Sequence, residues 1–194
     1  MTTKREEVLS WDGYFMSLAM MASFRSKDPS TQNGCCIIDI ESKNILSMGY
    51  NGVPRGCSDD EFPWNREGNE VDTKYPYVEH AERNAIYNAV RNGIKLNNSA
   101  LYLYSEKGLY PCKDCARAII QSGIKSVTML FCEKTPDIKW DYNATLRMFK
   151  SVPIRVNIMH GDDLQINMEK QTIKDMLLIS SKMSDINKKL SEGV

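Results

Sequence analysis

Residues 101–131, LYLYSEKGLYPCKDCARAIIQSGIKSVTMLF, contain the pattern from which the fold class follows. Short apolar runs at 101–105 and 126–131 have the length and composition of buried strands. Between them, residues 112–121 are predicted as a helix. Gly123 follows this helix, and glycine is favoured where a helix ends in a left-handed turn. The segment therefore predicts a strand, a helix and a second strand.

The residues on both sides extend this alternation of helices and strands. The additional elements predicted are a helix at 10–25, a strand hairpin at 34–40 and 45–50, a helix at 80–92, a helix at 142–149 and a strand at 154–159. This order indicates an α/β fold in which one mixed five-stranded sheet has helices on both faces.

Two segments do not fit the alternation. Residues 51–78 form a long connection rich in Gly, Pro and Asp, and connections of that length are uncommon unless they are functional. Residues 161–194 place apolar side chains at alternating three- and four-residue steps, as on a coiled-coil seam, on a helix docked to a partner or on a helix lying against its own domain. We predict a domain at 1–160 and a C-terminal helical tail at 161–194.

Charge and hydropathy limit the partners. The 194 residues include 25 Lys plus Arg and 25 Asp plus Glu, so the formal net charge is zero. Proteins that bind nucleic acid mainly through counterion release usually carry a basic excess, so we expect no nucleic-acid partner. No run approaches the roughly 20 apolar residues of a membrane-spanning helix, and the N-terminus lacks an apolar signal core. We expect a cytoplasmic protein that has reduced thiols and no membrane partner.

The chain has six cysteines and two histidines. Cys35, Cys36 and Cys132 lie in apolar runs typical of strands and are predicted to pack in the core. Cys57 lies in the long connection and has no predicted role. Closely spaced cysteines in a reducing compartment more often bind metal than form a disulfide.

Two short motifs carry the chemistry, His80-Ala81-Glu82 and Pro111-Cys112-Lys113-Asp114-Cys115. Each motif opens a predicted helix, and 28 residues separate Glu82 from Pro111. One imidazole and two thiolates give three zinc ligands and leave the fourth tetrahedral position for water, as in catalytic sites. The helix N-termini also favour the thiolate form. We predict His80, Cys112 and Cys115 as ligands of Zn2+.

Glu82 lies two residues after His80 and is predicted as the catalytic proton-transfer group. A carboxylate beside a zinc site can take a proton from water and pass it to a leaving nitrogen. The pattern H-x-E…P-C-x-x-C is the one found in zinc-dependent nucleobase deaminases.

Several further segments match the pattern of one known family, and the match covers about residues 10–160. These segments are Ser26-Lys27-Asp28-Pro29, Gln32, 49–56 and 72–78. With the zinc motif, they resemble the deoxycytidylate (dCMP) deaminase family of the zinc-dependent cytidine deaminase-like superfamily. The resemblance implies a three-layer α/β/α cytidine deaminase-like fold and hydrolytic conversion of dCMP to dUMP and ammonia, which feeds thymidylate synthesis. It also implies a homo-oligomer, a hexamer.

The resemblance implies contacts for the substrate and for effectors. Asn51 would hold the deoxyribose or base, Ser26 and Lys27 would face the 5′-phosphate, and the Ala81 N–H would meet the pyrimidine carbonyl. Lys27 as a solvated surface lysine and Asn51 as a turn residue are the structural alternatives. Regulated members are activated by dCTP and inhibited by dTTP, and the effector-binding candidates are Tyr50, Gly52 and Arg55.

The chain departs from the family pattern at several places, and the tail from about residue 161 onward has no counterpart in it. The segment 104–110 is about two residues longer, and Arg83 stands where many members have an apolar residue. A Tyr expected near the base is missing after the last catalytic strand, with Trp140 or Tyr142 as substitutes.

Two other functions compete with dCMP deamination. One is deamination of another substrate: a free nucleotide or nucleoside, a riboflavin precursor or a base within RNA. RNA is disfavoured because the chain lacks a cluster of Lys and Arg interleaved with aromatic residues. The other is a zinc-stabilised interaction protein that uses the C-terminal helix.

Overall fold

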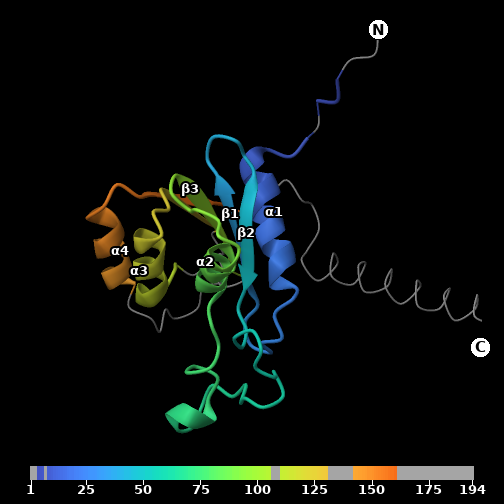
Figure 1. The fold of residues 1–194 in the computed structure, drawn as a ribbon, viewed down its shortest axis with the longest axis vertical. Coiled ribbons are helices and arrows are strands. Elements are labelled where there is room, and N and C mark those ends of the chain that lie inside the picture. The colour runs from blue at the N-terminus through green and yellow to red at the C-terminus, as the bar shows by residue number, and fades with distance from the viewer. Residues whose placement is uncertain (1–3, 7, 106–109, 131–141, 161–194) are drawn as a thin grey trace, which may run out of the picture.

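The computed structural model describes residues 4–6, 8–105, 110–130 and 142–160 (Figure 1). The predicted tail at 161–194, with its C-terminal helix, lies outside these residues, as do Cys132 and Trp140. The domain boundary at residue 160 therefore stays a prediction. The elements are α1 (Trp11–Ser23), β1 (Asn33–Asp39), β2 (Ile45–Tyr50), the 3-10 helix η1 (Glu70–Asp72), α2 (Ala81–Arg91), β3 (Ser99–Ser105), α3 (Lys113–Gln121), β4 (Ser126–Leu130), α4 (Asn143–Lys150) and β5 (Arg155–Met159).

The five strands form one mixed sheet in the order β2-β1-β3-β4-β5. Strand β1 runs antiparallel to both β2 and β3, whereas β4 is parallel to β3 and β5 is parallel to β4. The predicted mixed five-stranded sheet is confirmed.

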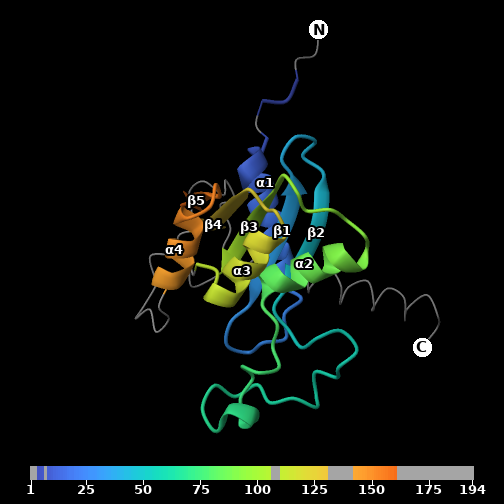
Figure 2. The same ribbon diagram turned by 60° about the vertical axis from the view of Figure 1, so that its left-hand side comes forward.

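Helices cover both faces of the sheet, which gives the three layers seen in Figures 1 and 2. Along β1, side chains alternate between the faces. Cys36 and Ile38 pack with residues of α1, while Cys35 and Ile37 pack with residues of α2 and α3. Both neighbouring cysteines are fully buried, so the prediction that Cys35 and Cys36 are core residues is confirmed.

Two glycines let helices approach the sheet closely. A Cβ atom at Gly34 would lie 1.9 Å from the carbonyl oxygen of Ala19 in α1. A Cβ atom at Gly49 would lie 2.4 Å from the backbone nitrogen of Ala85 in α2. A larger residue at Gly49 would therefore push α2, with the site residues at its N-terminus, away from the sheet.

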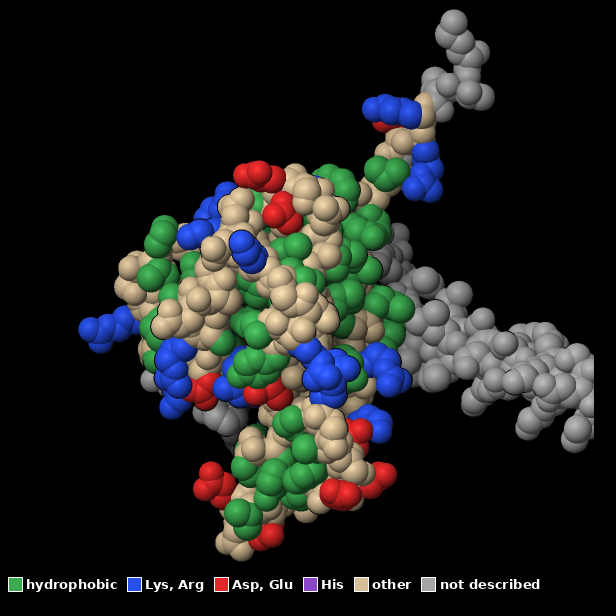
Figure 3. Space-filling model, in the orientation of Figure 1, with side chains coloured by type: hydrophobic (Ala, Val, Ile, Leu, Met, Phe, Trp, Pro, Cys, Tyr) green, Lys and Arg blue, Asp and Glu red, His purple; other side chains and the backbone are tan. Residues whose placement is uncertain are grey.

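The connection 51–79 projects from the body of the domain beyond the N-terminal end of α2 (Figures 1 and 2). It contains η1, which the sequence analysis did not predict. Acidic and hydrophobic side chains lie on its surface in Figure 3, and the exposed hydrophobic ones include Val71 and Tyr75. Thr73 and Lys74 are buried and anchor the segment.

None of the helices within the described residues has the length and apolar content needed to span a membrane.

Candidate functional site

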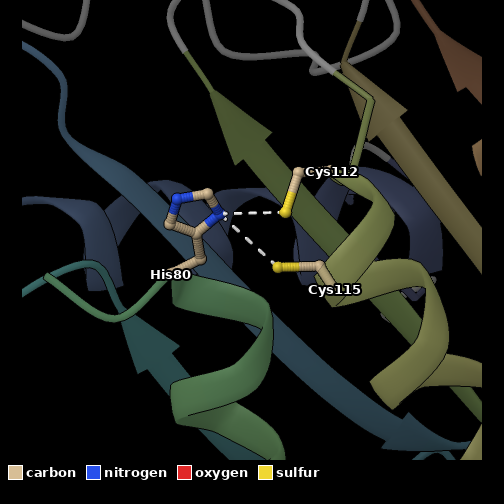
Figure 4. Close-up of side chains that lie close together, drawn as sticks. All are labelled: His80, Cys112 and Cys115. Atoms are coloured by element: carbon tan, nitrogen blue, oxygen red, sulfur yellow. Dashed lines mark hydrogen bonds between the residues drawn. The ribbon is translucent and has the colours of Figure 1, made fainter. Parts of the chain in front are cut away.

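His80, Cys112 and Cys115 come together where the N-termini of α2 and α3 meet at one end of the sheet (Figure 4). His80 is the N-cap residue of α2, Cys112 is the N-cap residue of α3, and Cys115 lies in the first turn of α3. Neither side chain forms the N-cap hydrogen bond of its helix. Both are therefore available as ligands.

The spacing of the three ligand atoms suits a tetrahedral metal. Nδ1 of His80 lies 3.6 Å from Sγ of Cys112 and 3.5 Å from Sγ of Cys115. All three ligand atoms lie within 4.8 Å of one another. Zinc bonds of about 2.0–2.3 Å in a tetrahedron place ligand atoms roughly 3.5 Å apart. The residues present therefore fit zinc in both chemistry and spacing.

The three groups also share protons. Hydrogen bonds from Cys115 and His80 lower the pKa of Cys112 to about 3, so Cys112 is a thiolate. The hydrogen bond to Cys112 raises the pKa of His80 to about 9. The bond to the Cys112 thiolate, together with burial, raises the pKa of Cys115. Metal binding would displace these protons, so metal affinity at this group should rise with pH.

Glu82 lies in the first turn of α2, next to this group, and its side chain is buried. Burial raises the pKa of its carboxyl group, although the charge on His80 opposes that shift. The Glu82 charge also contributes, after burial, to the raised pKa of the Cys35 thiol on β1. The carboxyl group therefore lies close to both the three ligand candidates and Cys35 of the sheet, and it holds its proton to a higher pH than an exposed glutamate does.

Arg83 places a positive charge beside the same group. Its guanidinium lies 2.5 Å from the Glu79 carboxylate, one helical turn away. Burial lowers the pKa of Arg83, but the charges of Glu79 and Cys115 outweigh this effect and raise it. Besides its pairing with Glu79, this cation lies close enough to Cys115 for the two charges to interact.

Tyr142 lies within electrostatic reach of the site. Its ring centroid is 5.8 Å from that of Tyr110, in a tilted arrangement. Burial, followed by the charges of Cys112 and Glu82, raises the pKa of Tyr142 to about 12. Tyr142, one of the two residues expected to replace the missing Tyr near the base, therefore lies near the site. The other, Trp140, lies outside the described residues.

The residues predicted to contact substrate form a network of their own. The Ser26 hydroxyl donates a hydrogen bond of 2.8 Å to the Asn51 carbonyl. The Asn51 amide donates to Asp28 (3.2 Å) and to the Thr31 carbonyl (2.9 Å), and its oxygen accepts from the Asn33 N–H (2.8 Å). Both amide hydrogens of Asn51 are therefore used by protein acceptors.

Lys27 and Ala81 lie in different surroundings. The Lys27 ammonium is exposed and pairs with Asp59 of the projecting connection at 2.6 Å. Ala81, the first residue of α2, is fully buried beside His80 and Glu82. Only Ala81 of these two thus directly adjoins the ligand candidates.

Two of the effector candidates, Tyr50 and Arg55, contact α2, and the third, Gly52, contacts the residue before His80. The carbonyl of Tyr50 accepts a hydrogen bond from Asn84, and Arg55 donates to the side chain of Asn88, one turn further along α2. Gly52 exchanges two backbone hydrogen bonds, of 3.0 and 2.9 Å, with Glu79. This bridge ties the Gly-Tyr-Asn-Gly segment to the residue that precedes His80.

Two residues that sequence reasoning did not single out complete this network. Lys74 of the projecting connection and Asp28 of the loop after α1 form a buried ion pair of 2.5 Å. Both residues lie in segments that carry the family resemblance, at 26–29 and 72–78. Their place in these segments was the one feature of the sequence that could have pointed to them. No local pattern indicates that Lys74 and Asp28 pair with each other.

Comparisons with known proteins place the chain among deaminases. The family model for the cytidine and deoxycytidylate deaminase zinc-binding region matches residues 9–131, which include all three ligand candidates and Glu82. The chain is 49% identical to the deoxycytidylate deaminase of Mus musculus over 128 residues, 66% of this chain and 68% of that protein. It is 45% identical to the probable deoxycytidylate deaminase of Drosophila melanogaster over 157 residues, 78% of this chain and 73% of that protein.

The fold is also similar to that of a solved structure. The dCMP deaminase of cyanophage S-TIM5, crystallised in complex with dCMP and dUMP, matches with a TM-score of 0.57 and 23% identity, over 75% of this chain and 94% of that one. At this identity the likeness shows the fold alone. The expected cytidine deaminase-like architecture is thereby confirmed.

Proposed function

The chain belongs to the family of cytidine and deoxycytidylate deaminases, and from this we propose that it hydrolyses dCMP to dUMP and ammonia with the help of zinc. The observation that carries the proposal is the buried carboxyl group of Glu82 beside His80, Cys112 and Cys115. A purely structural zinc site needs a fourth protein ligand and has no use for such a carboxyl group.

His80, Cys112 and Cys115 would hold the metal, since one imidazole and two thiolates match the donors that zinc prefers. When bound, zinc supplies a nucleophilic hydroxide at neutral pH and acts as a Lewis acid. The positive ends of α2 and α3 favour the thiolate form of both cysteines.

Glu82 would move the protons of the reaction. Its carboxylate takes a proton as water attacks C4 of the cytosine ring, and then gives a proton to the amine that leaves as ammonia. A carboxyl group whose pKa is raised by burial suits both steps, because it exchanges protons closer to the operating pH. Its low exposure keeps bulk water from competing for the proton.

Four residues are candidates for contacts to the phosphate, the sugar and the pyrimidine carbonyl of the nucleotide. Ser26 and Lys27 remain the candidates for the 5′-phosphate, and Lys27 would exchange the Asp59 carboxylate for that phosphate. The Ala81 N–H remains the candidate for the pyrimidine carbonyl. Asn51, predicted to hold the deoxyribose or base, could contact substrate only through its oxygen atom, because both amide hydrogens are used.

Regulation and assembly are part of the same proposal. Tyr50 and Arg55 contact α2 and Gly52 contacts Glu79 just before it, so an effector such as dCTP or dTTP bound there would act on the helix that carries His80 and Glu82. The predicted homohexamer, the supply of dUMP for thymidylate synthesis and the cytoplasmic location rest on the family resemblance and the composition. Sedimentation analysis with and without dCTP would test the hexamer.

A substrate panel tests the proposed function. Ammonia release should be fastest with dCMP, compared with dCTP, cytidine and guanine, and should respond to added dCTP and dTTP. A preference for unphosphorylated cytidine would contradict the phosphate contacts of Ser26 and Lys27. If the purified zinc-loaded protein releases no ammonia from any of these compounds, the interaction-protein alternative gains support instead.

A further inference from the structure

Asn33 begins β1 at the end of the sheet that carries the candidate site. In the ladder between β1 and β3, Asn33 lies opposite Ser105, the last residue of β3. The neighbouring Gly34 lies opposite Tyr50, the last residue of β2. The chain continues from β3 towards Cys112 and returns from the projecting connection to His80. The start of β1 therefore lies at the same end of the sheet as the candidate site.

The side chain of Asn33 is on the site's face of the sheet. Gly34 faces α1, since a Cβ atom there would meet Ala19, so its neighbour Asn33 faces the opposite side with Cys35. Cys35 is close enough to Glu82 for the carboxylate charge to raise its pKa. Two residues along a strand span about 7 Å. Asn33 thus lies on the same face of the sheet as Cys35, about 7 Å further towards the sheet end.

The side-chain oxygen of Asn33 is buried and accepts no hydrogen bond. Among the described residues, the only other buried side-chain nitrogen or oxygen atom without a hydrogen-bond partner is Nε of Arg83, which is a donor. The Asn33 backbone is held firmly: its N–H donates to the Asn51 side chain, and its carbonyl accepts from the Asn51 N–H. Buried polar atoms in folded proteins nearly always have a partner, and an unpaired one reduces stability. An unpaired acceptor on this face and at this end of the sheet is what a site that receives a donor from a ligand would contain.

We propose that Asn33 is a substrate-binding residue whose side-chain oxygen accepts a hydrogen bond from the 3′-hydroxyl group of the deoxyribose. The inference rests on the proposed function. At neutral pH, dCMP offers two donors, the exocyclic amine and the 3′-hydroxyl, because its phosphate is deprotonated. The amine is the leaving group and must lie at Glu82. Asn33 lies two residues beyond Cys35 towards the sheet end, which leaves the sugar hydroxyl as the donor for its oxygen.

This assignment gives Asn51 a positioning role. Its amide hydrogens go to Asp28 and Thr31, and its oxygen fixes the backbone of Asn33. Asn51 would then act on the sugar through Asn33. The ion pair of Asp28 and Lys74 supports this arrangement from behind.

The test compares dCMP with 2′,3′-dideoxycytidine 5′-monophosphate in the zinc-loaded wild-type enzyme and in Asn33→Leu, a substitution of nearly equal volume. A neutral hydrogen bond is worth about tenfold or less in kcat/KM. We expect the wild type to favour dCMP by up to about tenfold, and Asn33→Leu to lose that advantage by slowing only on dCMP. Equal losses on both compounds would overturn the proposal.

Two additions keep the comparison decisive. Asn157→Leu on β5, away from the site, serves as the matched control and should keep the wild-type preference. The thermal unfolding temperature of Asn33→Leu without substrate should be no lower than that of the wild type, because the variant has no unpaired buried oxygen at this position. If Asn33→Leu does not fold, Asn33→Ala takes its place in the same two-substrate comparison. A wild-type enzyme that fails to deaminate dCMP refutes the proposed function itself, and that result is distinct from equal losses in the variant.

Discussion

The ammonium group of Lys74 lies 2.5 Å from the carboxylate of Asp28, and only 6% and 2% of these side chains are exposed. The pair joins the projecting connection to the loop after α1. Asp28 also accepts a hydrogen bond from Asn51 and, through its other oxygen, from the N–H groups of Ser30 and Thr31. A buried charge pair thus holds the polar wall of the candidate site.

Lys74→Met should destabilise the protein strongly, because it leaves the Asp28 carboxylate buried without its cation. Breaking a buried pair in this way costs about 3–5 kcal/mol. Urea denaturation of the purified protein would measure the loss. Lys27→Met is the matched control: Lys27 also pairs with an aspartate, but its side chain is 62% exposed, so the loss of stability should be far smaller than in Lys74→Met. Equal losses in the two variants would contradict the structural role given to Lys74.

Glu82→Gln should retain zinc and lose turnover. The amide keeps the shape of the side chain but cannot take a proton, so kcat should fall by at least about 10²–10⁴-fold. Metal content by elemental analysis and ammonia release from dCMP are the two measurements. Glu70→Gln, on the exposed helix η1, is the control and should keep both its zinc and its turnover of dCMP. Undiminished turnover in Glu82→Gln would remove Glu82 from the mechanism.

The pH dependence of kcat/KM should report the raised pKa of Glu82. The group must be deprotonated to accept a proton, so activity is present above its pKa and is lost as pH falls through it. Because burial raises this pKa, the acidic limb should lie above the value of about 4.3 that is usual for glutamate. A pH–rate profile for dCMP would show the limb. An acidic limb at or below the usual value would contradict the environment described for Glu82.

Cys112→Ser and Cys115→Ser should each lose zinc and activity, since three ligand candidates leave no spare protein donor. Treatment of the wild type with a chelator should abolish ammonia release, and added zinc should restore it. Cys57→Ser provides the comparison, because Cys57 is an exposed free thiol in the projecting connection. The Cys57→Ser variant should bind as much zinc as the wild type. Full activity in the chelated enzyme would refute a zinc-dependent reaction.

The layout of the fold was predictable because local patterns carried it. Apolar runs and glycine stops located each helix and each strand of the sheet, and β3 began two residues earlier than predicted, at Ser99. Ser99 and Ala100 have no strand signal of their own and are drawn into the ladder by pairing with Asp39 and Ile38 of β1. The helix η1 was missed because its three residues have no helical periodicity.

The amino-acid order alone was enough to find the chemistry of the site. His80, Glu82, Cys112 and Cys115 lie in two motifs that each open a helix, so the sequence alone identifies them as a set of zinc ligands and a proton-transfer group. Packing of the two helices on the sheet brings the motifs together. The tertiary structure was needed for the wall around them. Lys74 and Asp28 are 46 positions apart, and Asn33 and Asn51 are 18 apart. Which partners such polar side chains find depends on burial and on long-range packing, which no local pattern encodes.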